Sequence, residues 1–344
     1  MKGLLLAGGT GSRLRPLTFT GAKQLIPVAN RPILFYVVEA MVAAGVKDIG
    51  VIVGETASLI QDALGDGEKF GCHFTYILQD RPLGLADAVR TAQPFLKDAA
   101  FLMMLGDNLL RGGLTDLVQK FSRHPSAAQL LLTEVAHPEA FGVAVLDGDR
   151  VVKLMEKPVH PPSPWALVGA YCFDPVIHTA IAQLKPSARG EYEITDAIQN
   201  LIDRNLPVEA SFVTGWWKDT GRPEDVLEAN RLVLADISSK IEGDVDEYSV
   251  VDGPVVIGAG AIVRHSVLRG PAVIGHGAHI ERSYIGPYTA VGDGVQVLHT
   301  DVENSVVLAD SILDRVPMRI DQSLIGRGVR INVSEDRPRA LRVV

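Results

Sequence analysis

The stretch Leu4-Leu5-Leu6-Ala7-Gly8-Gly9-Thr10-Gly11-Ser12-Arg13-Leu14 is an apolar run that ends in a loop with three glycines and a cation. Residues 2–7 predict a β-strand, because a short apolar run before a turn signal is typical of a buried strand. The loop predicts a phosphate site, since backbone N–H groups without side chains beside them can close on phosphate oxygens. Two common phosphate motifs, G-x-x-x-x-G-K-[ST] and G-x-G-x-x-G, do not match it. A second cation, Lys23, follows ten residues after Arg13.

Composition indicates a globular protein with room for two domains. The chain has 344 residues and a formal net charge of -8. This acidity argues against nucleic acid as the main partner, because binding of a phosphate backbone needs a basic surface. The two cysteines, Cys72 and Cys172, are too few for a disulfide framework and indicate thiols in a reducing compartment. No apolar run is as long as a membrane span, so we expect no membrane partner and a cytoplasmic location.

Residues 1–240 predict an α/β domain with a mostly parallel sheet flanked by helices. Strand-like runs at 49–53 and 101–105 alternate with a helix-like segment that begins at Pro32 and ends at Gly45. The second run leads directly into Gly106-Asp107-Asn108. Ligands of open α/β folds bind at the carboxyl ends of the strands. We therefore expect the glycine loop and Asp107 to share one crevice.

Residues 245–335 lose the helical pattern and repeat every 17 residues. Three short faces per turn, each burying one aliphatic residue, predict a triangular parallel β-helix. The register loosens between Asp314 and Arg319, and residues 336–344 form a basic tail. The positions in phase are the aliphatic residues Ile257, Ile274, Val291, Leu308 and Ile325, and the glycines Gly258, Gly260, Gly275, Gly277, Gly292, Gly294, Gly326 and Gly328.

The loop G-G-x-G-x-R resembles the signature of the sugar-1-phosphate nucleotidyltransferases, and the Lys23-Gln24-Leu25 segment is similar to their glucose-1-phosphate thymidylyltransferase branch. The repeat resembles the left-handed hexapeptide β-helix that many members carry at the C-terminus. The resemblance implies transfer of a nucleotidyl group from dTTP or UTP to glucose-1-phosphate, with Mg²⁺ as the cofactor and pyrophosphate as the second product. It also implies a homo-oligomer formed through the β-helix.

The same resemblance assigns the reacting groups. Gly8, Gly9 and Gly11 would cradle the triphosphate. Arg13 and Lys23 would stabilise the charge of the reacting and departing phosphates, since both are donors suited to phosphate oxygens. Asp107 and Asp219, each beside a glycine or before one, would hold the magnesium, which prefers one or two carboxylates. Taken singly, each aspartate also fits a turn former or a helix cap.

The substrate contacts follow from two further motifs. Glu156-Lys157-Pro158 resembles the family's sugar-phosphate clamp, with Gly142 beside it, although an exposed Glu-Lys pair is also common in loops. Phe141 stands where relatives often have tyrosine, so a contact from a phenol is not expected. Gln79, Pro82 and Gly84 would bind the nucleobase, because a glutamine amide suits the edge of thymine or uracil. The segment 190–196 also matches the family but its side chains are left without a role.

Two other functions stay open. The β-helix contains four histidines that could serve a second, acyltransferase site, although exposed histidines are usually only solvated. The chain could also be a regulatory subunit that keeps the fold and lacks chemistry; that function predicts losses among the five catalytic residues, and all five are present. The histidines are His265, His276, His279 and His299, and the five catalytic residues are Arg13, Lys23, Asp107, Lys157 and Asp219.

Overall fold

The computed structural model describes residues 1–19, 21–332 and 342–343. It divides into two compact units, Met1–Leu25 with Ile33–Asp219, and Ile26–Pro32 with Thr220–Val344. The limits 1–240 and 245–335 expected from the sequence remain a prediction. The basic tail at 336–344 lies outside the described residues, apart from β31 (Arg342–Val343), which pairs antiparallel with the last coil.

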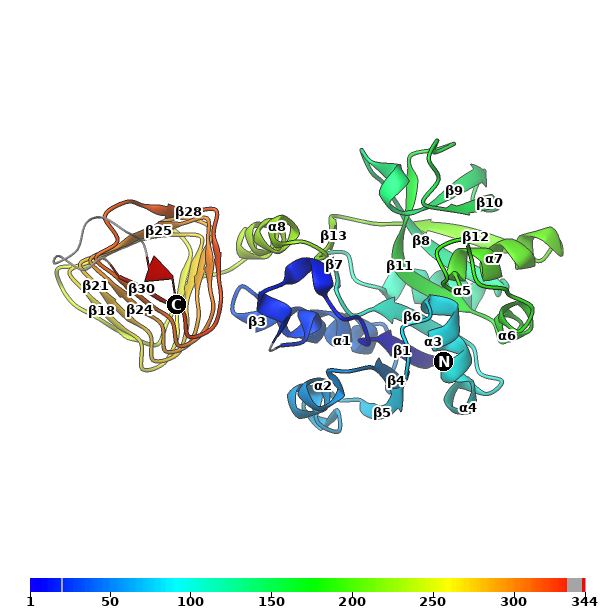
Figure 1. Cartoon of the computed structure of the whole chain (residues 1–344), viewed down its shortest axis with the longest axis horizontal. Helices are drawn as coiled ribbons and strands as arrows, with labels where there is room; N and C mark the ends of the chain where they lie inside the picture. The colour runs from blue at the N-terminus through cyan, green and yellow to red at the C-terminus, as the bar shows by residue number, and fades with distance from the viewer. Residues whose placement is uncertain (20, 333–341, 344) are drawn as a thin grey trace. The chain divides into compact units, whose positions relative to one another are not determined.

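A nine-stranded sheet is the centre of the first unit (Figure 1). Its first strand follows from the opening apolar run, whose residues 4–7 are buried. In spatial order the strands are β5 (His73–Leu78), β4 (Asp48–Val53), β1 (Lys2–Leu6), β6 (Phe101–Leu105), β11 (Trp165–Phe173), β8 (Ala128–Glu134), β12 (Val208–Phe212), β10 (Arg150–Glu156) and β9 (Gly142–Asp147).

The strands on either side of β1, from which the glycine loop continues, are parallel, and the rest of the sheet is mixed. Strands β5, β4, β1 and β6 are parallel neighbours, as is the pair β12 and β8. Strand β11 runs antiparallel to both of its main neighbours, and β10 to both of its own. The α/β fold is confirmed. Strands β9 and β10 form a hairpin that turns at Gly148, whose φ is 60°. The remaining antiparallel pairs come mainly from β11, which runs opposite to β6 and β8.

Helices cover both faces of the sheet and bury two apolar cores (Figure 1). The expected helix after Pro32 is present, with Pro32 itself in a short strand and a left-handed turn at Gly45 (φ 87°) after its end. One face carries α1 (Ile33–Ala43), α2 (Ala57–Leu64) and α5 (Thr115–Arg123), and the other α3 (Leu85–Thr91), α4 (Gln93–Leu96), α6 (Ile177–Ile181) and α7 (Ile194–Asp203).

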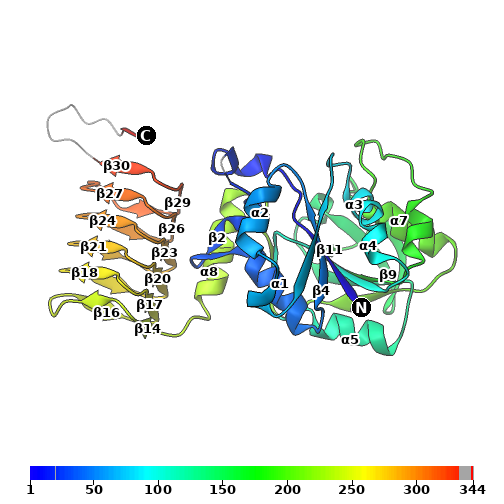
Figure 2. The same cartoon turned by 90° about the horizontal axis from the view of Figure 1, so that it is seen from below.

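The second unit contains a parallel β-helix whose coils stack in Figure 2. Three parallel sheets form its faces, which fits the predicted left-handed helix. The first sheet is β14 (Lys240–Ile241), β17 (Val255–Ile257), β20 (Ala272–Ile274), β23 (Thr289–Val291), β26 (Val306–Val307) and β29 (Leu324–Ile325); the second is β15 (Asp244–Val245), β18 (Ile262–Arg264), β21 (His279–Glu281), β24 (Gln296–Leu298), β27 (Ile312–Asp314) and β30 (Arg330–Asn332); the third is β16 (Val250–Asp252), β19 (Val267–Arg269), β22 (Tyr284–Ile285), β25 (Asp301–Glu303) and β28 (Ile320–Asp321).

The aliphatic repeat is the core of the coils, with one correction. Ile257, Ile274 and Val291 are paired in register and fully buried, as the 17-residue period predicts. The prediction of Leu308 at the next position was wrong: Val307 pairs with Val291 and with Ile325. One coil is therefore a residue shorter and the next a residue longer. The irregular segment predicted after Asp314 is present, since no strand covers 315–319.

Hydroxyl side chains tie successive coils together at one corner. Ser249 Oγ accepts the N–H of Ser266, Ser266 Oγ accepts that of Ser283, and Ser283 Oγ accepts that of Thr300, each at 3.1 Å. These backbone groups are buried and would otherwise lack a ladder partner at the bend. The corner explains why small polar residues recur in an otherwise apolar repeat.

Helix α8 (Pro223–Leu234) and the hairpin of β2 (Pro27–Val28) and β3 (Arg31–Pro32) pack within the second unit. The buried Asn230 side chain accepts the N–H of Ala29 (2.9 Å) and donates to the carbonyl of Tyr288 (3.0 Å). Asn30 donates to the carbonyl of Val291 at 2.6 Å. Polar contacts thus attach both segments to the coil that contains β23.

Candidate active site

The carboxyl ends of β1 and β6 bring the glycine loop and Asp107 to one place. The two strands are parallel neighbours, and the Gly106 N–H donates to the carbonyl of Leu6 at 2.9 Å. A Cβ on Gly106 would lie 2.8 Å from that carbonyl oxygen. Glycine is therefore needed for Asp107 to begin its turn beside the loop, as the sequence suggested.

Gly11 shapes the loop around Lys23. Its φ of 64° lies in the left-handed region, and a Cβ there would be 2.8 Å from Lys23 Cβ and 2.9 Å from Thr18 Cγ2. Thr18 Oγ1 donates to the Gly11 carbonyl at 2.8 Å. A Cβ on Gly9 would lie 3.3 Å from Lys23 Cε. The glycines thus allow the lysine to lie against the loop.

Lys23 and Asp107 form a largely buried ion pair, with side chains 20% and 13% exposed, in which Lys23 Nζ contacts Asp107 Oδ2. Burial opposes the charged lysine, but the Asp107 carboxylate and then Asp219 outweigh it, so the pKa of Lys23 is raised above its ordinary value. The charge of Arg13 acts in the opposite direction, which places this exposed side chain within electrostatic range of Lys23. Two cations and two carboxylates therefore act on one another here.

A short antiparallel ladder brings Asp219 to the site. Strand β13 (Trp217–Asp219) pairs with β7 (Asn108–Leu110), and Asp219 lies opposite Asn108. The buried Asn108 side chain donates to Asp107 Oδ1 at 2.9 Å and accepts the Trp217 indole N–H at 2.7 Å. Asn108 thus orients one aspartate and fixes the strand that carries the other.

Glu156 is the centre of a second polar cluster. Arg189 Nη1 donates to its Oε1 (3.1 Å), Thr195 Oγ1 donates to its Oε2 (3.2 Å), and Lys157 Nζ is 3.8 Å from Oε1. Gly142 pairs with Glu156 across β9 and β10, and a Cβ on it would lie 2.9 Å from Thr195 Cγ2. The glycine therefore keeps the space through which Thr195 reaches the carboxylate.

Phe141 connects this cluster with β13. The Lys157 N–H donates to the Phe141 carbonyl at 3.0 Å, and Lys157 is held at a positive φ of 41°. The Phe141 ring packs edge to face against Trp217, with centroids 5.3 Å apart. The residue that replaces the expected tyrosine thus has a packing role.

Gln79 and Gly84 lie in a turn that follows β5. The Gln79 N–H donates to the Val53 carbonyl at 2.9 Å. Gly84 has a φ of 107°, and a Cβ on it would be 2.5 Å from the Tyr192 carbonyl oxygen. The Tyr192 N–H in turn donates to Leu83 at 2.7 Å. The close approach that requires glycine is therefore with the segment 190–196, while Pro82 of the same turn is exposed.

The profile of the nucleotidyl transferase family matches residues 2–236, which include the loop, both aspartates and the Glu156 cluster. The chain belongs to this family. A glucose-1-phosphate thymidylyltransferase of Streptomyces antibioticus is 54% identical over all of this nucleotidyltransferase and 97% of its own length. A low-salt glycan biosynthesis nucleotidyltransferase of Haloferax volcanii is 49% identical over 98% of this chain and 95% of its own.

A solved structure shares the fold over part of the chain. It is from Bacillus anthracis, is described as a glucose-1-phosphate thymidylyltransferase in complex with sucrose, and is 36% identical. Its TM-score is 0.65, over 70% of this nucleotidyltransferase and 98% of that chain. The enzyme class expected from the sequence is confirmed.

The donor set fits a divalent metal, which this family generally uses. Asp107 already presents Oδ2 to a cation, the Lys23 ammonium, and Asp219 acts electrostatically on the same ammonium. Mg²⁺ needs only one or two carboxylates when substrate phosphates and waters supply its other oxygens. Over residues 1–19, 21–332 and 342–343, no group of three or more His, Cys, Asp or Glu side chains could hold a metal.

Sequence reasoning missed three residues of the nucleotidyltransferase site. They are Asn108, which directly follows Asp107, Arg189, which immediately precedes the segment 190–196, and Asp87, which lies in α3 and binds Gln79. The position of Asn108 after Asp107 was a usable signal. Nothing local marks Arg189 or Asp87, because their partners, Glu156 and Gln79, are brought to them by the fold.

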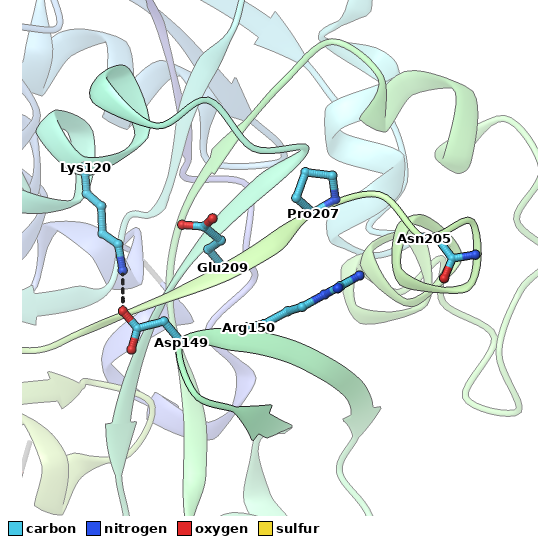
Figure 3. Close-up of a pocket in the computed structure, with 6 residues that line it drawn as sticks. All are labelled: Lys120, Asp149, Arg150, Asn205, Pro207 and Glu209. Atoms are coloured by element: carbon cyan, nitrogen blue, oxygen red, sulfur yellow. Dashed lines mark hydrogen bonds and ion pairs between the residues drawn. The ribbon is translucent and has the colours of Figure 1, made fainter.

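A separate pocket of the nucleotidyltransferase unit contains none of the predicted site residues (Figure 3). It has a volume of about 510 Å³, and its Lys120 ammonium is bound to Asp149 (3.1 Å) and to the Ala210 carbonyl (2.8 Å). Arg150 begins β10, whereas Glu156 ends that strand. The pocket therefore lies away from the Glu156 cluster.

Within the described part of the chain, no helix combines the length and apolarity that a membrane span requires.

Proposed function

We propose that this nucleotidyltransferase transfers the nucleotidyl group of dTTP, or of UTP, to glucose-1-phosphate. The observation that carries the proposal is the buried pair of Lys23 and Asp107 beside the glycine loop, with Asp219 and Arg13 acting on the same ammonium. It is a site for a highly charged phosphate substrate. The names of the Streptomyces antibioticus and Bacillus anthracis proteins support the choice of thymidylyl transfer to glucose-1-phosphate.

The reaction forms one bond and breaks one. An oxygen of the sugar phosphate forms a bond to the α-phosphorus, the bond from that phosphorus to the bridging oxygen breaks, and pyrophosphate leaves with the electron pair. No general base is needed, since a phosphate monoester with a second pKa near 6 is largely ionised at neutral pH. Catalysis then consists of alignment and charge stabilisation.

The cluster around Lys23 and the cluster around Glu156 would have different roles in this alignment and charge stabilisation. Gly8, Gly9 and Gly11 would receive the triphosphate, with Arg13 and Lys23 stabilising the charge that develops on it and on pyrophosphate. In the other cluster, Lys157 would hold the sugar phosphate in line, and Glu156 would accept sugar hydroxyls. Its bonds to Arg189 and Thr195 keep the Glu156 carboxylate in a fixed position.

Asp107 and Asp219 would hold Mg²⁺ together with phosphate oxygens of the substrate. A bound Mg²⁺ would neutralise the charge of the triphosphate and favour departure of pyrophosphate. Asn108 would keep Asp107 oriented in both the metal-bound and the metal-free protein.

The alternatives from the sequence are less well supported. A subunit without chemistry has no need of a largely buried lysine that is paired with one carboxylate and lies in the field of a second. Two of the four β-helix histidines, His265 and His299, occupy left-handed corners that Arg282 and Arg315 also occupy in neighbouring coils. Their recurrence follows the coil geometry, so an acyltransferase site is not proposed.

A homo-oligomer formed through the β-helix and a cytoplasmic location remain predictions; both thiols are free, as a reducing compartment favours.

The test is pyrophosphate release by the full chain with Mg²⁺. Each of dTTP, UTP, ATP, GTP and CTP is combined with glucose-1-phosphate, and dTTP also with the 1-phosphates of galactose, mannose and N-acetylglucosamine. Highest kcat/KM with dTTP or UTP and glucose-1-phosphate is expected. A preference for a purine triphosphate would contradict the assignment of Gln79, and no release with any pair would favour the regulatory subunit.

A further inference from the structure

The side-chain amide of Gln79 has its nitrogen committed within the protein. Gln79 Nε2 donates to Asp87 Oδ2 at 2.8 Å and, more weakly, to the Gly84 carbonyl at 3.4 Å. A carboxylate and a carbonyl only accept hydrogen bonds. The nitrogen, and not the oxygen, of the amide therefore faces both groups.

The Asp87 side chain is itself buried and has a second partner besides Gln79. It lies in α3, is 6% exposed, and has its other carboxylate oxygen in contact with the Arg90 guanidinium. Arg90 lies over the ring of Tyr192, 4.5 Å from its centroid. The Asp87 carbonyl also accepts the hydroxyl of Thr91 at 2.9 Å. The Asp87 carboxylate is thus buried, with one oxygen accepting from Gln79 and the other paired with Arg90.

The oxygen of the Gln79 amide is the atom left to accept a hydrogen bond from a nucleobase, because the nitrogen faces Asp87 and Gly84. The expectation that the amide offers both a donor and an acceptor to the base stays a prediction. An acceptor matches the N3–H of thymine or uracil. Cytosine carries a lone pair at N3 instead, so the same oxygen would face another acceptor and a hydrogen bond would be lost.

We propose that Asp87 is a positioning residue that sets Gln79 as an acceptor and so selects thymine or uracil over cytosine. The inference rests on the proposed function, in which Gln79 contacts the base. Asp87 itself touches no substrate. It acts by excluding the flipped amide, in which nitrogen would face the base and fit cytosine.

The test compares dTTP with dCTP in Asp87→Asn. An asparagine at this position can present either oxygen or nitrogen to Gln79, so the stronger constraint on the amide is removed and the longer contact with the Gly84 carbonyl is the one that remains. The ratio of kcat/KM for dTTP to that for dCTP should fall about tenfold, the effect of one misplaced hydrogen bond. A residue with a merely structural role would lower both values together and leave the ratio unchanged, and that result would overturn the proposal.

Two matched variants distinguish the effect of the Gln79 amide orientation from the effect of removing a charge near it. Arg90→Gln removes the ion pair but keeps the Asp87 to Gln79 bond, and should leave the ratio within about twofold of the parent. Asp62→Asn makes the same chemical change on the exposed side of α2 and should also leave it unchanged. A fall in the ratio for Arg90→Gln equal to that for Asp87→Asn would contradict the role of the amide.

A measurement on the unmodified protein covers the case in which Asp87→Asn does not fold. N3-methylthymidine triphosphate lacks the N3–H, so its affinity by calorimetry should be at least about tenfold below that of dTTP. Equal affinities would overturn the proposal. If the protein turns over dTTP yet either test fails, only this inference is lost; a protein that uses purine nucleotides alone would lose the proposed function with it.

Discussion

At the residue scale, one continuous set of contacts carries the site. Trp217 donates to Asn108, Asn108 donates to Asp107, and Asp107 pairs with Lys23, which lies against the glycine loop. Lys23 and Asp107 are the members that would touch substrate or metal, and Asn108 and Trp217 hold Asp107 in place. Two consequences for single substitutions follow.

Asp107→Asn should remove most of the activity and leave the fold intact. The amide keeps the size of the carboxylate but loses the charge that would bind Mg²⁺ and hold Lys23, so we expect kcat to fall by about 100-fold or more. Pyrophosphate release against Mg²⁺ concentration measures the effect, and circular dichroism checks the fold. Turnover close to that of the parent in this variant would contradict the metal assignment.

Asn108→Ala should weaken the site without touching a substrate. It removes the hydrogen bond that Asn108 donates to Asp107 Oδ1 and takes away the acceptor of the Trp217 N–H. The Mg²⁺ concentration for half-maximal rate should therefore rise about 10- to 100-fold, as expected for a group that orients a metal ligand. Gln119→Ala, an amide removed from the exposed side of α5, is the control. An unchanged Mg²⁺ requirement would show that Asn108 has no orienting role.

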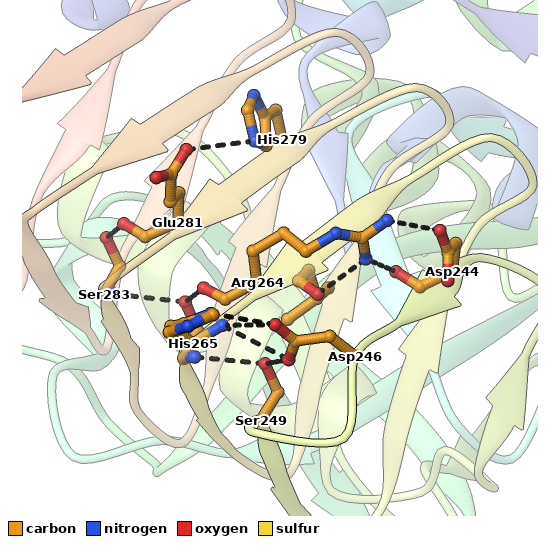
Figure 4. A network of polar contacts seen from close by, with 10 residues as sticks. Asp244, Asp246, Ser249, Arg264, His265, His279, Glu281 and Ser283 are labelled. Carbon is orange, nitrogen blue, oxygen red and sulfur yellow. Dashed lines mark hydrogen bonds and ion pairs between the residues drawn. The ribbon is translucent and has the colours of Figure 1, made fainter.

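At the element scale, the β-helix depends on its polar corners as well as on its aliphatic core. The core residues recur because every coil needs one per face, and the hydroxyls recur because every bend leaves a buried N–H. Figure 4 shows one edge of this arrangement, in which Asp246 accepts from Ser249 (2.5 Å) and from the backbone and ring of His265.

Ser283→Ala should destabilise the coils. Its hydroxyl donates to the Glu281 carbonyl (2.7 Å) and accepts the buried N–H of Thr300 (3.1 Å). The Glu281 carbonyl also accepts the His299 N–H (2.9 Å), so loss of the hydroxyl leaves the Thr300 N–H as the unsatisfied group. The expected cost is about 1–3 kcal/mol, measured as a lower midpoint of chemical unfolding. Ser238→Ala, at an exposed position before the first coil, should change the midpoint by far less. Equal effects would argue against the corner.

Asp246→Asn should lower stability at neutral pH but not in acid. The hydrogen bond from Ser249, and then those from His265, hold the pKa of Asp246 below its ordinary value, with burial opposing them. A carboxyl whose pKa is depressed on folding adds stability above its unfolded pKa and loses it as the pH falls through the folded value. The melting temperatures of variant and parent should therefore differ at pH 7, begin to converge near the ordinary carboxyl pKa of about 4, and meet only below the lowered pKa of Asp246. A constant difference across this range would contradict the account.

Local pattern was sufficient for the elements but not for their contacts. The apolar run at 2–7 and the repeat through Val291 follow from periodicity, whereas Leu308 was misplaced because one coil is a residue shorter. The meeting of Asp219 with Asn108 depends on the pairing of β7 with β13, which joins segments distant in sequence. The role of Asp87 could not be predicted, because the turn between the two residues is what brings its partner, Gln79, within hydrogen-bond distance.

At the scale of the whole molecule, two chain segments leave the site and join the second unit. The hairpin of β2 and β3 begins four residues after Lys23, and α8 begins four residues after Asp219. Both are attached through Asn30 and Asn230 to the coil that contains β23. The segment that carries Lys23 and the segment that carries Asp219 therefore both continue into the unit that contains the β-helix.

The most direct test of the central claim follows the oxygen that forms the new bond. Glucose-1-phosphate labelled with ¹⁸O on its phosphate is incubated with dTTP, Mg²⁺ and the full chain, and the products are examined by ³¹P NMR and mass spectrometry. Attack of the sugar phosphate on the α-phosphorus predicts ¹⁸O in the bridge of the nucleotide sugar and none in pyrophosphate. Label in pyrophosphate, or a bridge without label, would contradict it.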